Sequence, residues 1–360
     1  MLRIPVHTAS RDYEVWLQAG LLRDAGRRLQ PLLGVGRPLF VVSSARVCRK
    51  WGGVLLPSLN RAGFRVQLVL MPDGERVKRL ATLEALAEKL IRRRADRDAV
   101  VVAFGGGVVG DTAGLLASLY MRGVELVQIP STVLAQVDSC IGGKTGVNLV
   151  AGKNLLGTFH QPKVVLIDPE VLASLSDRQY RAGLYEALKC GVIGDARLFR
   201  MFEQKRAEIL RRDPAVVNRI IAHSVRLKSA TVSADERESG VRQMLNFGHT
   251  LGHAFEAQSG YRMLHGEAVA RGMVGATRIA ELIGLCDAVT ARRIRDAVVG
   301  MGTLPPVKFD SHAILRRLRS DKKARGGQVR FVLPRKIGEM HIVAGVPSTV
   351  VIAALEAGFD

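Results

Sequence analysis

The sequence predicts an α/β amino-terminal domain built on a parallel sheet, followed by a mainly α-helical carboxyl-terminal domain. Over residues 1–176, short β-branched runs alternate with helical patterns, which is typical of βαβ units. One run, Ala99–Phe104, leads straight into Gly105-Gly106-Gly107 and a new apolar helix. From residue 177 onward, apolar residues recur at helical spacing instead. We therefore expect two domains, residues 1–176 and residues 177–360.

The first domain should contain strands that alternate with helices. Alternating apolar and polar residues predict strand structure within residues 1–17. Further strands are predicted at Pro38–Val42, Phe64–Leu70, Ala99–Phe104 and Val124–Ile129, and helices at Leu21–Leu33, Arg46–Ala62, Lys78–Arg94 and Val108–Met121. Because the two types alternate, the sheet should be parallel and covered by helices.

The second domain should be helical over most of its length. The helical pattern runs from Asp177 to Gly302, with breaks at Gly194, Asp213-Pro214 and Ser259-Gly260, and the next strong strand pattern is Val329–Leu333.

The net charge of +20 over 360 residues restricts the partners. A strongly basic chain can bind nucleic acid, a membrane surface or a small acidic substrate. Most basic residues are arginines spread along predicted helices, and the aromatic residues, 5% of the chain, are not interleaved with them as in single-strand binders. We therefore expect no nucleic-acid partner, and we interpret most of this charge as a solvated, arginine-rich surface.

The cysteines indicate a reducing compartment. Cys48, Cys140, Cys190 and Cys286 lie far apart and form no CxxC pair, which argues against a disulfide framework and a Cys-rich zinc site. The first residues lack the apolar core of a signal peptide, and no apolar run is long enough to span a bilayer. We expect a cytoplasmic protein with no membrane partner.

A histidine-rich segment is the strongest candidate for a metal site. His249 and His253 are four residues apart and share one helix face, and His265 follows beyond a turn. Imidazole suits zinc and neighbouring metals. Three unrelated surface histidines are the simpler interpretation, but Asn246 and Glu267 nearby favour a site that holds something.

The glycine turn is a candidate phosphate site. The segment Phe104–Asp111, FGGGVVGD, follows a predicted strand and opens a helix, so backbone N–H groups can approach a pyrophosphate. It matches neither GxGxxG nor the P-loop, and a tight turn without a ligand is the alternative. Pro130-Ser131-Thr132 follows the next strand, where its hydroxyls can reach the same ligand.

Two further segments contain charged residues. Neither segment, taken alone, decides what these residues do. The segment Gln136–Asn154 is too polar and glycine-rich for a core element, and its two Gly-Lys pairs, at Lys144 and Lys153, suggest an anionic substrate. In GLYEALK, Glu186 and Lys189 lie one helical turn apart. A solvated ion pair explains that spacing equally well.

Motifs in a fixed order run along nearly the whole chain. They are PDGERVK (72–78), GGGVVGD (105–111), MRGV (121–124), PSTVLAQVDSCIGGKTGVN (130–148), GKN (152–154), GLYEALK (183–189), ADERESGVRQMLNFGHTLGHAFE (234–256), LHGEAVARGM (264–273) and DKK (321–323). Together they resemble the 3-dehydroquinate synthase family.

The resemblance implies an NAD-binding first domain, a metal- and substrate-binding second domain, and an active site between them. The implied activity is that of a carbon–oxygen lyase, which converts 3-deoxy-D-arabino-heptulosonate 7-phosphate to 3-dehydroquinate and phosphate in the shikimate pathway. Transient oxidation by NAD, phosphate elimination, re-reduction and intramolecular aldol closure make up this reaction. NAD and one zinc or cobalt ion per chain are the implied cofactors, and a homodimer is the implied assembly.

The resemblance also assigns site residues. The implied metal ligands are Glu186, His249 and His265. The implied substrate and catalytic contacts are Arg122, Asp138, Lys144, Asn154, Lys189, Lys228, Arg242, Asn246, His253, and Lys322 or Lys323. The implied NAD contacts are Asp73, Gly74, Glu75, Arg76, Val77, Lys78, Gly105, Gly106, Gly107, Val108, Val109, Gly110, Asp111, Ser131, Thr132, Lys144, Lys153, Val171, Leu172, Ala173 and Ser174. Ser131 and Ser174 stand where the family has threonine, and Ser43-Ser44 replaces Thr-Asn at an adenosine contact.

Spacing and resemblance disagree about the metal. Spacing alone selects His249, His253 and His265, whereas the resemblance replaces His253 with Glu186. We favour the second set, because two histidines and one glutamate leave positions open for substrate oxygens. His253 is then free to hydrogen-bond the substrate or its departing phosphate.

Three other classes of protein compete with this interpretation. Secondary-metabolic sugar-phosphate cyclases, such as 2-deoxy-scyllo-inosose and 2-epi-5-epi-valiolone synthases, would share fold and cofactors, but the valiolone type lacks counterparts of Asn246 and His253. Iron-dependent alcohol or glycerol dehydrogenases act on uncharged substrates, which leaves the Gly-Lys pairs without a purpose. A non-catalytic basic binding protein leaves the histidine cluster unexplained.

Overall fold

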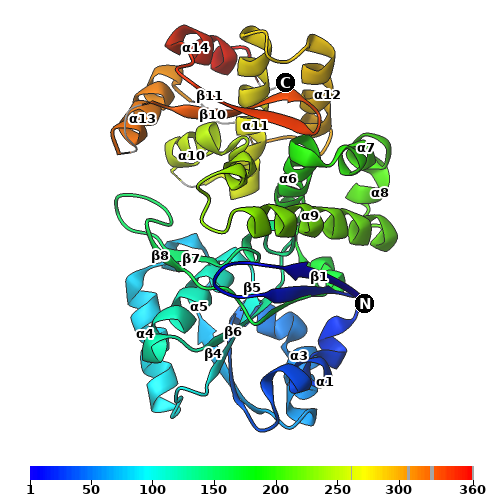
Figure 1. Cartoon of the computed structure of the whole chain (residues 1–360), viewed down its shortest axis with the longest axis vertical. Helices are drawn as coiled ribbons and strands as arrows, with labels where there is room; N and C mark the ends of the chain where they lie inside the picture. Colours follow the sequence, from blue (N-terminus) through cyan, green and yellow to red (C-terminus); the bar gives the residue numbers. More distant parts are fainter. Residues whose placement is uncertain (261, 306–308, 325–327, 359–360) are drawn as a thin grey trace. The chain divides into compact units, whose positions relative to one another are not determined.

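The computed structural model describes residues 1–260, 262–305, 309–324 and 328–358, with the backbone alone for residues 319–324. The chain divides into two compact units (Figure 1). The first unit comprises Met1–Leu175 and Lys228–Arg237, and the second comprises Ser176–Leu227 and the described part of Glu238–Asp360.

The first unit alternates strands and helices, as predicted. Its elements are β1 (Leu2–Val6), β2 (Tyr13–Leu17), α1 (Leu21–Leu33), β3 (Pro38–Ser44), α2 (Ala45–Val47), η1 (Cys48–Gly52), α3 (Gly53–Arg61), β4 (Arg65–Met71), η2 (Glu75–Val77), α4 (Leu80–Arg92), β5 (Val100–Gly105), α5 (Gly107–Leu119), η3 (Tyr120–Arg122), β6 (Glu125–Pro130), η4 (Ala135–Ser139), β7 (Lys144–Val147), β8 (Leu156–Phe159), β9 (Val164–Ile167) and η5 (Pro169–Ser174). The helix expected over residues 46–62 is broken by the π-helical turn η1, which ends at the Gly52-Gly53 pair.

The sheet is mostly parallel and has the strand order β1-β2-β9-β6-β5-β3-β4. Only the edge pair β1–β2 is antiparallel, because a hairpin joins these two strands. The order reverses between β3 and β5, which are neighbours although β4 lies between them in sequence. In open parallel sheets, ligands bind beyond the carboxyl ends of the strands at such a reversal. The glycine turn lies at this point, since it follows β5 directly.

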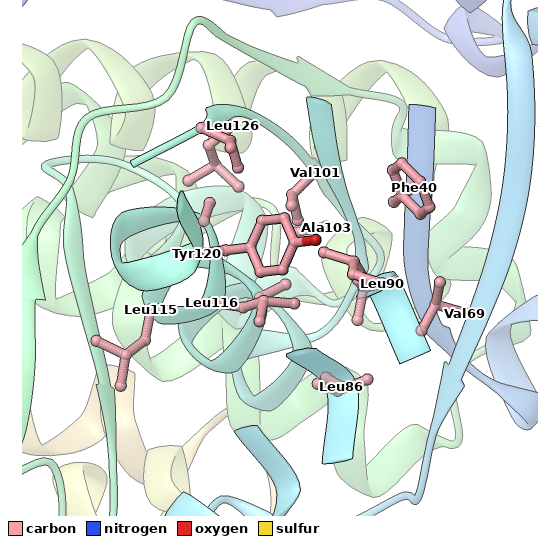
Figure 2. Close-up of a cluster of buried hydrophobic side chains, with 14 of the residues drawn as sticks. Phe40, Val69, Leu86, Leu90, Val101, Ala103, Leu115, Leu116, Tyr120 and Leu126 are labelled. Carbon is pink, nitrogen blue, oxygen red and sulfur yellow. The ribbon is translucent and has the colours of Figure 1, made fainter. Parts of the chain in front are cut away.

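One face of the sheet is covered by α4 and α5. Figure 2 shows Leu86 and Leu90 of α4 and Leu116 of α5 against Phe40 and Val101, which are paired in register across β3 and β5. Residues of one strand alternate between faces, so the fully buried strands are apolar on both sides. This core fixes the strand ends that carry the candidate nucleotide site.

The expectation that residues 136–154 are too polar for a core element is wrong. Strand β7 is buried from Thr145 to Val147 and pairs antiparallel with β8. Neither strand was predicted from the sequence. A Cβ on Gly114 of α5 would lie 2.6 Å from Cγ2 of Thr145, so glycine permits this packing. The Thr145 hydroxyl lies 2.8 Å from that of Thr158, and this hydrogen bond satisfies both polar groups inside the fold.

The second unit is helical, as predicted, with one small sheet. Its elements are α6 (Asp177–Gly194), α7 (Ala196–Gln204), α8 (Arg206–Leu210), the larger part of α9 (Pro214–Ala234), η6 (Val241–Asn246), α10 (His249–Gln258), α11 (His265–Leu282), α12 (Ala288–Val299), α13 (Ser311–Ala324), β10 (Arg330–Lys336), β11 (Glu339–Ala344) and α14 (Ser348–Glu356). Strand β10 was predicted, and β11 pairs with it antiparallel. None of the helices in the described residues combines the length and apolar character needed to cross a bilayer.

The segment Lys228–Arg237 belongs to the first unit, not to the second as expected. Nζ of Lys228 lies 2.5 Å from Oδ1 of Asp138. The amide of His7 donates to Oγ of Ser233 at 3.0 Å. These contacts join positions far apart in sequence, and helical periodicity carries no signal for them.

Candidate active site

A buried ion pair lies in the middle of α6. Glu186 and Lys189 are 0% and 1% exposed, and their Oε2 and Nζ atoms are 2.5 Å apart. Helix α6 starts at Ser176, whose hydroxyl accepts a hydrogen bond from the amide of Gln179, and it is enclosed from Ala182 to its last turn. Because burying two charges is costly, such a pair needs further partners. The solvated ion pair considered from the sequence is therefore excluded.

Two histidines face Glu186 from the first residues of two other helices. His249 opens α10 and His265 opens α11, and their Nε2 atoms lie 3.8 and 3.4 Å from Oε1 of Glu186. Nδ1 of His249 lies 3.2 Å from the carbonyl oxygen of Phe247. Nδ1 of His265 lies 3.5 Å from Oε2 of Glu256. Both imidazoles therefore turn Nε2 toward the same carboxylate.

Glycines allow these helices to approach closely. A Cβ on Gly266 of α11 would lie 1.7 Å from the carbonyl oxygen of Ala182 in α6. A Cβ on Gly272 of α11 would lie 1.8 Å from the carbonyl oxygen of Gly248, the residue before α10. Gly248 itself has φ 79°, a left-handed conformation that glycine adopts without strain. Side chains at these positions would push apart the helices that carry the candidate ligands.

The structure brings together the metal-ligand set that the resemblance implied. Among the described residues, two groups have possible ligand atoms within 4.8 Å of one another: Glu186, His249 and His265, and His253, Glu256 and His265. The three-histidine set favoured by spacing alone is not one of them, although its ring centroids lie between 5.2 and 6.1 Å apart.

The carboxylates of Glu186 and Glu256 attract positive charge. Burial would raise the pKa of Glu186, but Lys189 and the two histidines hold it well below its usual range. Burial and the nearby Lys189 keep the pKa of His249 well below its usual value, so this ring is neutral. Burial also opposes charge on His265, yet the carboxylates of Glu186 and Glu256 raise its pKa to about 10. The two carboxylates thus draw positive charge to the space between them.

The donor set fits a divalent transition metal. Both carboxylate oxygens of Glu186 are buried, and neither accepts a hydrogen bond of ordinary geometry, although charged groups lie close to them. Buried oxygens of this kind are costly unless a partner satisfies them, and coordination to a cation would do so. One carboxylate and two imidazoles also form a common catalytic zinc set, which leaves a position open for water or substrate.

The glycine turn has the geometry of an anion site. Helix α5 begins at Gly107, and no side chain caps its first turn. A Cβ on Gly105 would lie 2.5 Å from Cβ of Val109, so any side chain there would block the turn. The first amides of a helix have no partners within it, and this end carries partial positive charge. A phosphate group suits such an end.

The side-chain hydroxyls of Ser43 and Ser44 make hydrogen bonds to the backbone of the first unit. The Ser43 hydroxyl donates to the carbonyl oxygen of Phe104 at 2.6 Å, and Oγ of Ser44 accepts from the amide of Val47. Both serines are buried. This pair therefore ties β3 to β5 and starts α2.

Lys78 joins three of the predicted motifs in the first unit. Lys78 is 3% exposed. Its ammonium group pairs with Asp111 and donates a 2.5 Å hydrogen bond to Oδ1 of Asn154. Burial raises the pKa of Asp111, and Lys78 opposes that shift. Oε1 of Glu75 lies 3.8 Å from Nζ of Lys153. The segment after β4, the glycine turn and the Gly-Lys loop thus form one cluster.

The remaining NAD candidates lie at the ends of parallel strands. Asp73, Gly74, Arg76 and Val77 follow β4, Ser131 and Thr132 follow β6, and Val171, Leu172, Ala173 and Ser174 follow β9. Gly106, Val108 and Gly110 belong to the turn and the first residues of α5. The carboxyl ends of parallel strands share one edge of the sheet, so the structure gathers these candidates along it.

The other substrate candidates differ in their surroundings. Asp138 pairs with Lys228, and Lys144 is exposed at the start of β7. Arg242 is 1% exposed, Nδ2 of Asn246 donates to Oε1 of Glu238 at 2.6 Å, and His253 is exposed on α10. Lys322 and Lys323 lie in α13, and their side chains are outside the described residues.

Arg122 stands apart from the other candidates of the first unit. It is exposed, with φ 65°, in the turn after the carboxyl end of α5. Because α5 has 13 residues, roughly 20 Å of helix separates that turn from the glycine turn. The assignment of Arg122 to the substrate therefore stays a prediction.

Sequence reasoning missed two carboxylates. Glu256 follows His249 by seven residues and His253 by three, so all three lie on one face of α10, and this spacing could have identified it. Glu238 contacts Asn246 across an irregular turn, for which the sequence offers no periodic signal.

The structure has the fold of a class of enzymes, the sugar-phosphate cyclases. The structure is similar to that of 2-epi-5-epi-valiolone synthase from Streptomyces hygroscopicus subsp. jinggangensis 5008, solved with NAD+ and Zn2+ bound, at 30% identity and a TM-score of 0.88 over 96% of each chain. It is also similar to 2-deoxy-scyllo-inosose synthase complexed with carbaglucose-6-phosphate, NAD+ and Co2+, at 24% identity and a TM-score of 0.88, over 99% of this chain and 100% of that one.

Within that class the sequence identifies the family. The family described as 3-dehydroquinate synthase N-terminal matches residues 68–182, and 3-dehydroquinate synthase C-terminal matches residues 183–324. The 3-dehydroquinate synthase of Koribacter versatilis (strain Ellin345) is 47% identical over 357 residues, which cover 99% of this chain and 98% of the relative. The chain belongs to the 3-dehydroquinate synthase family and is an enzyme, which confirms the prediction from its motifs.

Proposed function

We propose that Glu186, His249 and His265 hold the divalent ion with which this chain converts 3-deoxy-D-arabino-heptulosonate 7-phosphate to 3-dehydroquinate and phosphate. The observation that carries the proposal is the buried carboxylate of Glu186, whose oxygens lack ordinary hydrogen bonds and face two imidazole Nε2 atoms. Zinc is supported by the ion in the 30% identical valiolone synthase, and cobalt is the alternative.

The first unit would bind NAD along the carboxyl edge of its sheet. The amides at the start of α5, from Gly107 to Val109, would hold the pyrophosphate. Lys78 keeps Asp111 and Asn154 in place beside the turn. NAD in the solved valiolone synthase supports this cofactor. We therefore propose residues 1–176 as the NAD-binding domain and residues 177–360 as the metal- and substrate-binding domain, apart from the segment that starts at Lys228.

The chemistry would depend on holding one substrate through several steps. NAD held at the glycine turn would supply transient oxidation at C5 of the substrate, and a divalent ion held by Glu186, His249 and His265 would supply polarisation of the C5 oxygen. Lys189 lies beside the Glu186 carboxylate and would donate hydrogen bonds to a substrate oxygen there. His253, exposed one turn after His249, would exchange a proton with the substrate or with the departing phosphate. Lys144 would neutralise an anionic end of the substrate.

The activity is tested by phosphate release from three substrates. Purified protein with NAD and zinc should release phosphate from the heptulosonate phosphate. It should release much less from glucose 6-phosphate and sedoheptulose 7-phosphate, the substrates expected of the secondary-metabolic cyclases. A preference for sedoheptulose 7-phosphate would reject the proposal in favour of the valiolone type. Asn246, held by Glu238, and His253 favour the first outcome.

Replacing Lys144 or Lys153 with methionine should impair binding and leave the fold intact. Methionine keeps much of the stem and removes the charge, so KM for substrate or NAD should rise roughly tenfold or more. The stability of each variant should change by about 0.5 kcal/mol or less, because neither side chain is in the core. Steady-state kinetics and thermal unfolding measure both effects.

Lys163→Met is the matched control for these two variants. Lys163 precedes β9 and so lies at the opposite edge of the sheet. The KM values of Lys163→Met for substrate and NAD should equal those of the wild type. If Lys144→Met and Lys153→Met also showed wild-type kinetics, the two lysines would be ordinary solvated residues.

The net charge of +20 should serve capture of an anionic substrate and not nucleic-acid binding. Salt screens long-range attraction, with a Debye length of about 10 Å at 0.1 M. We expect kcat/KM to fall as ionic strength rises, and gel-shift assays at physiological salt to show no retained DNA or RNA. Tight nucleic-acid binding without cyclase activity would reverse this interpretation.

We also propose a homodimer in the cytoplasm. An apolar groove on the first unit, lined by Leu80, Ile91, Leu119 and Met121 among others, exposes side chains that an interface would cover. The four cysteines form no disulfide with one another, which suits a reducing compartment. Sedimentation as a single chain of 39.1 kDa would exclude the dimer, and cell fractionation tests the location.

A further inference from the structure

We propose that Glu256 is a positioning residue of the metal site, whose carboxylate accepts the Nδ1–H of His265 and so directs Nε2 of that ring toward the ion. This inference rests on the proposed function, because Glu256 has this role only if His265 is a metal ligand. It adds a residue outside the ligand set and outside the expected substrate contacts.

The ring of His265 lies between two buried carboxylates. Its Nε2 is 3.4 Å from Oε1 of Glu186, and its Nδ1 is 3.5 Å from Oε2 of Glu256, the long limit of a hydrogen bond. Glu256 is 1% exposed, so its charge needs a protein partner. A neutral imidazole carries one proton. If Nε2 gives its lone pair to a metal, that proton must be on Nδ1, where Glu256 is the acceptor.

The other ligand histidine is oriented in a different way. Nδ1 of His249 faces the carbonyl oxygen of Phe247, two residues earlier in the chain. That acceptor belongs to the backbone and is set by the turn that leads into α10. The acceptor for His265 is a side chain of another helix, and a carboxylate also makes its imidazole a stronger donor to the metal. Orientation of His265 therefore depends on one replaceable residue.

Zinc affinity of the full-length protein tests this role. Glu256→Ala should weaken zinc binding about 10- to 100-fold, the usual effect of removing a partner of a metal-bound histidine. Glu256→Gln keeps an oxygen acceptor of the same shape, so its loss should be smaller. Both affinities are measured by chelator competition. The visible absorption of the cobalt-loaded protein should change in Glu256→Ala, because the ring is no longer held in one orientation.

Glu267→Gln is the matched structural control. Glu267 is a second buried glutamate, two residues after His265, but it binds Arg178 and the amide of Leu264 and not the imidazole. This variant should lose stability and keep wild-type zinc affinity and the wild-type cobalt spectrum. If it weakened zinc binding as much as Glu256→Ala did, the role of Glu256 would be structural only, and the proposal would fail.

Other outcomes separate this inference from the proposed function. Wild-type zinc affinity in both Glu256 variants, with a wild-type protein that binds zinc and releases phosphate, would reject the inference alone. Loss of zinc in Glu256→Ala together with full affinity in Glu186→Gln would place the ion in the second group, with Glu256 as a ligand, and would also reject it. A wild-type chain that binds no metal would overturn both. Should Glu256→Ala not fold, Glu256→Gln decides.

Discussion

Glu186→Gln should lose its metal on dialysis, while His253→Ala keeps about one ion per chain and turns over slowly. Removing a direct metal ligand should weaken metal binding more than about 100-fold. This exceeds the usual effect of removing a residue that only hydrogen-bonds a ligand. His265→Ala should behave like Glu186→Gln. The loss of rate in His253→Ala should be about 10²- to 10⁴-fold, as for a general acid or base. Metal content after dialysis and phosphate release measure these effects.

The expected contrast follows from where the side chains lie. Glu186 is buried with both imidazole Nε2 atoms within 3.8 Å of one of its oxygens. His253 is exposed. The group of possible ligands to which it belongs, His253, Glu256 and His265, does not contain Glu186. A metal-free His253→Ala protein beside a fully loaded Glu186→Gln protein would show that helical spacing, and not the family pattern, identifies the ligands.

Gly266→Ala should destabilise the second unit by about 3 kcal/mol or more and also weaken metal binding. Overpacking a close contact usually costs about 1–3 kcal/mol, and here the added Cβ would lie 1.7 Å from a backbone oxygen of Ala182 that cannot rotate away. Helix α11 must shift from α6, and the shift separates His265 from Glu186. Urea unfolding and zinc affinity report the two effects.

Gly275→Ala is the control on the same helix. A Cβ there would meet only Cδ1 of Leu251, at 2.6 Å, the end of a side chain that can change rotamer. Its effect should be well below that of Gly266→Ala, with zinc affinity unchanged. Equal destabilisation by the two variants would mean that any methyl group on this face of α11 is disruptive, and that Gly266 has no special role in placing the ligands.

Much of the fold could be predicted because its signals are local. The bounds expected for α1, Leu21–Leu33, are those observed, since an apolar stripe and Gly34 define the helix within a few residues. The run Ala99–Phe104 and the glycines after it place both ends of β5 and the start of α5 within about one residue. The prediction failed at β7, where Thr145 and Gly146 suggested a polar loop, whereas the close packing of Thr145 against Gly114 places this strand in the interior.

The candidate site was predictable in part. The motifs indicated which residues to expect at the site, yet the segment GLYEALK gave no indication that Glu186 and Lys189 are buried. Burial depends on neighbours such as Gly266 that lie far along the chain. Spacing along one helix favours His253 as a ligand because periodicity describes a single element, whereas the set that we propose takes its ligands from three helices.

The three proposed ligands come from three separate helices, α6, α10 and α11, and this has a consequence for folding. Glu186 and His265 are 79 residues apart in sequence, so an ion bound between them closes a long loop of chain. Loss of the ion releases that cross-link, and only the folded chain offers the three donors together. By linkage, each tenfold excess of free metal over its dissociation constant adds about 1.4 kcal/mol to the folded state. If these residues bind the ion, the metal supply of the cell would set how much of this enzyme survives heat and proteolysis, in addition to how much of it is active.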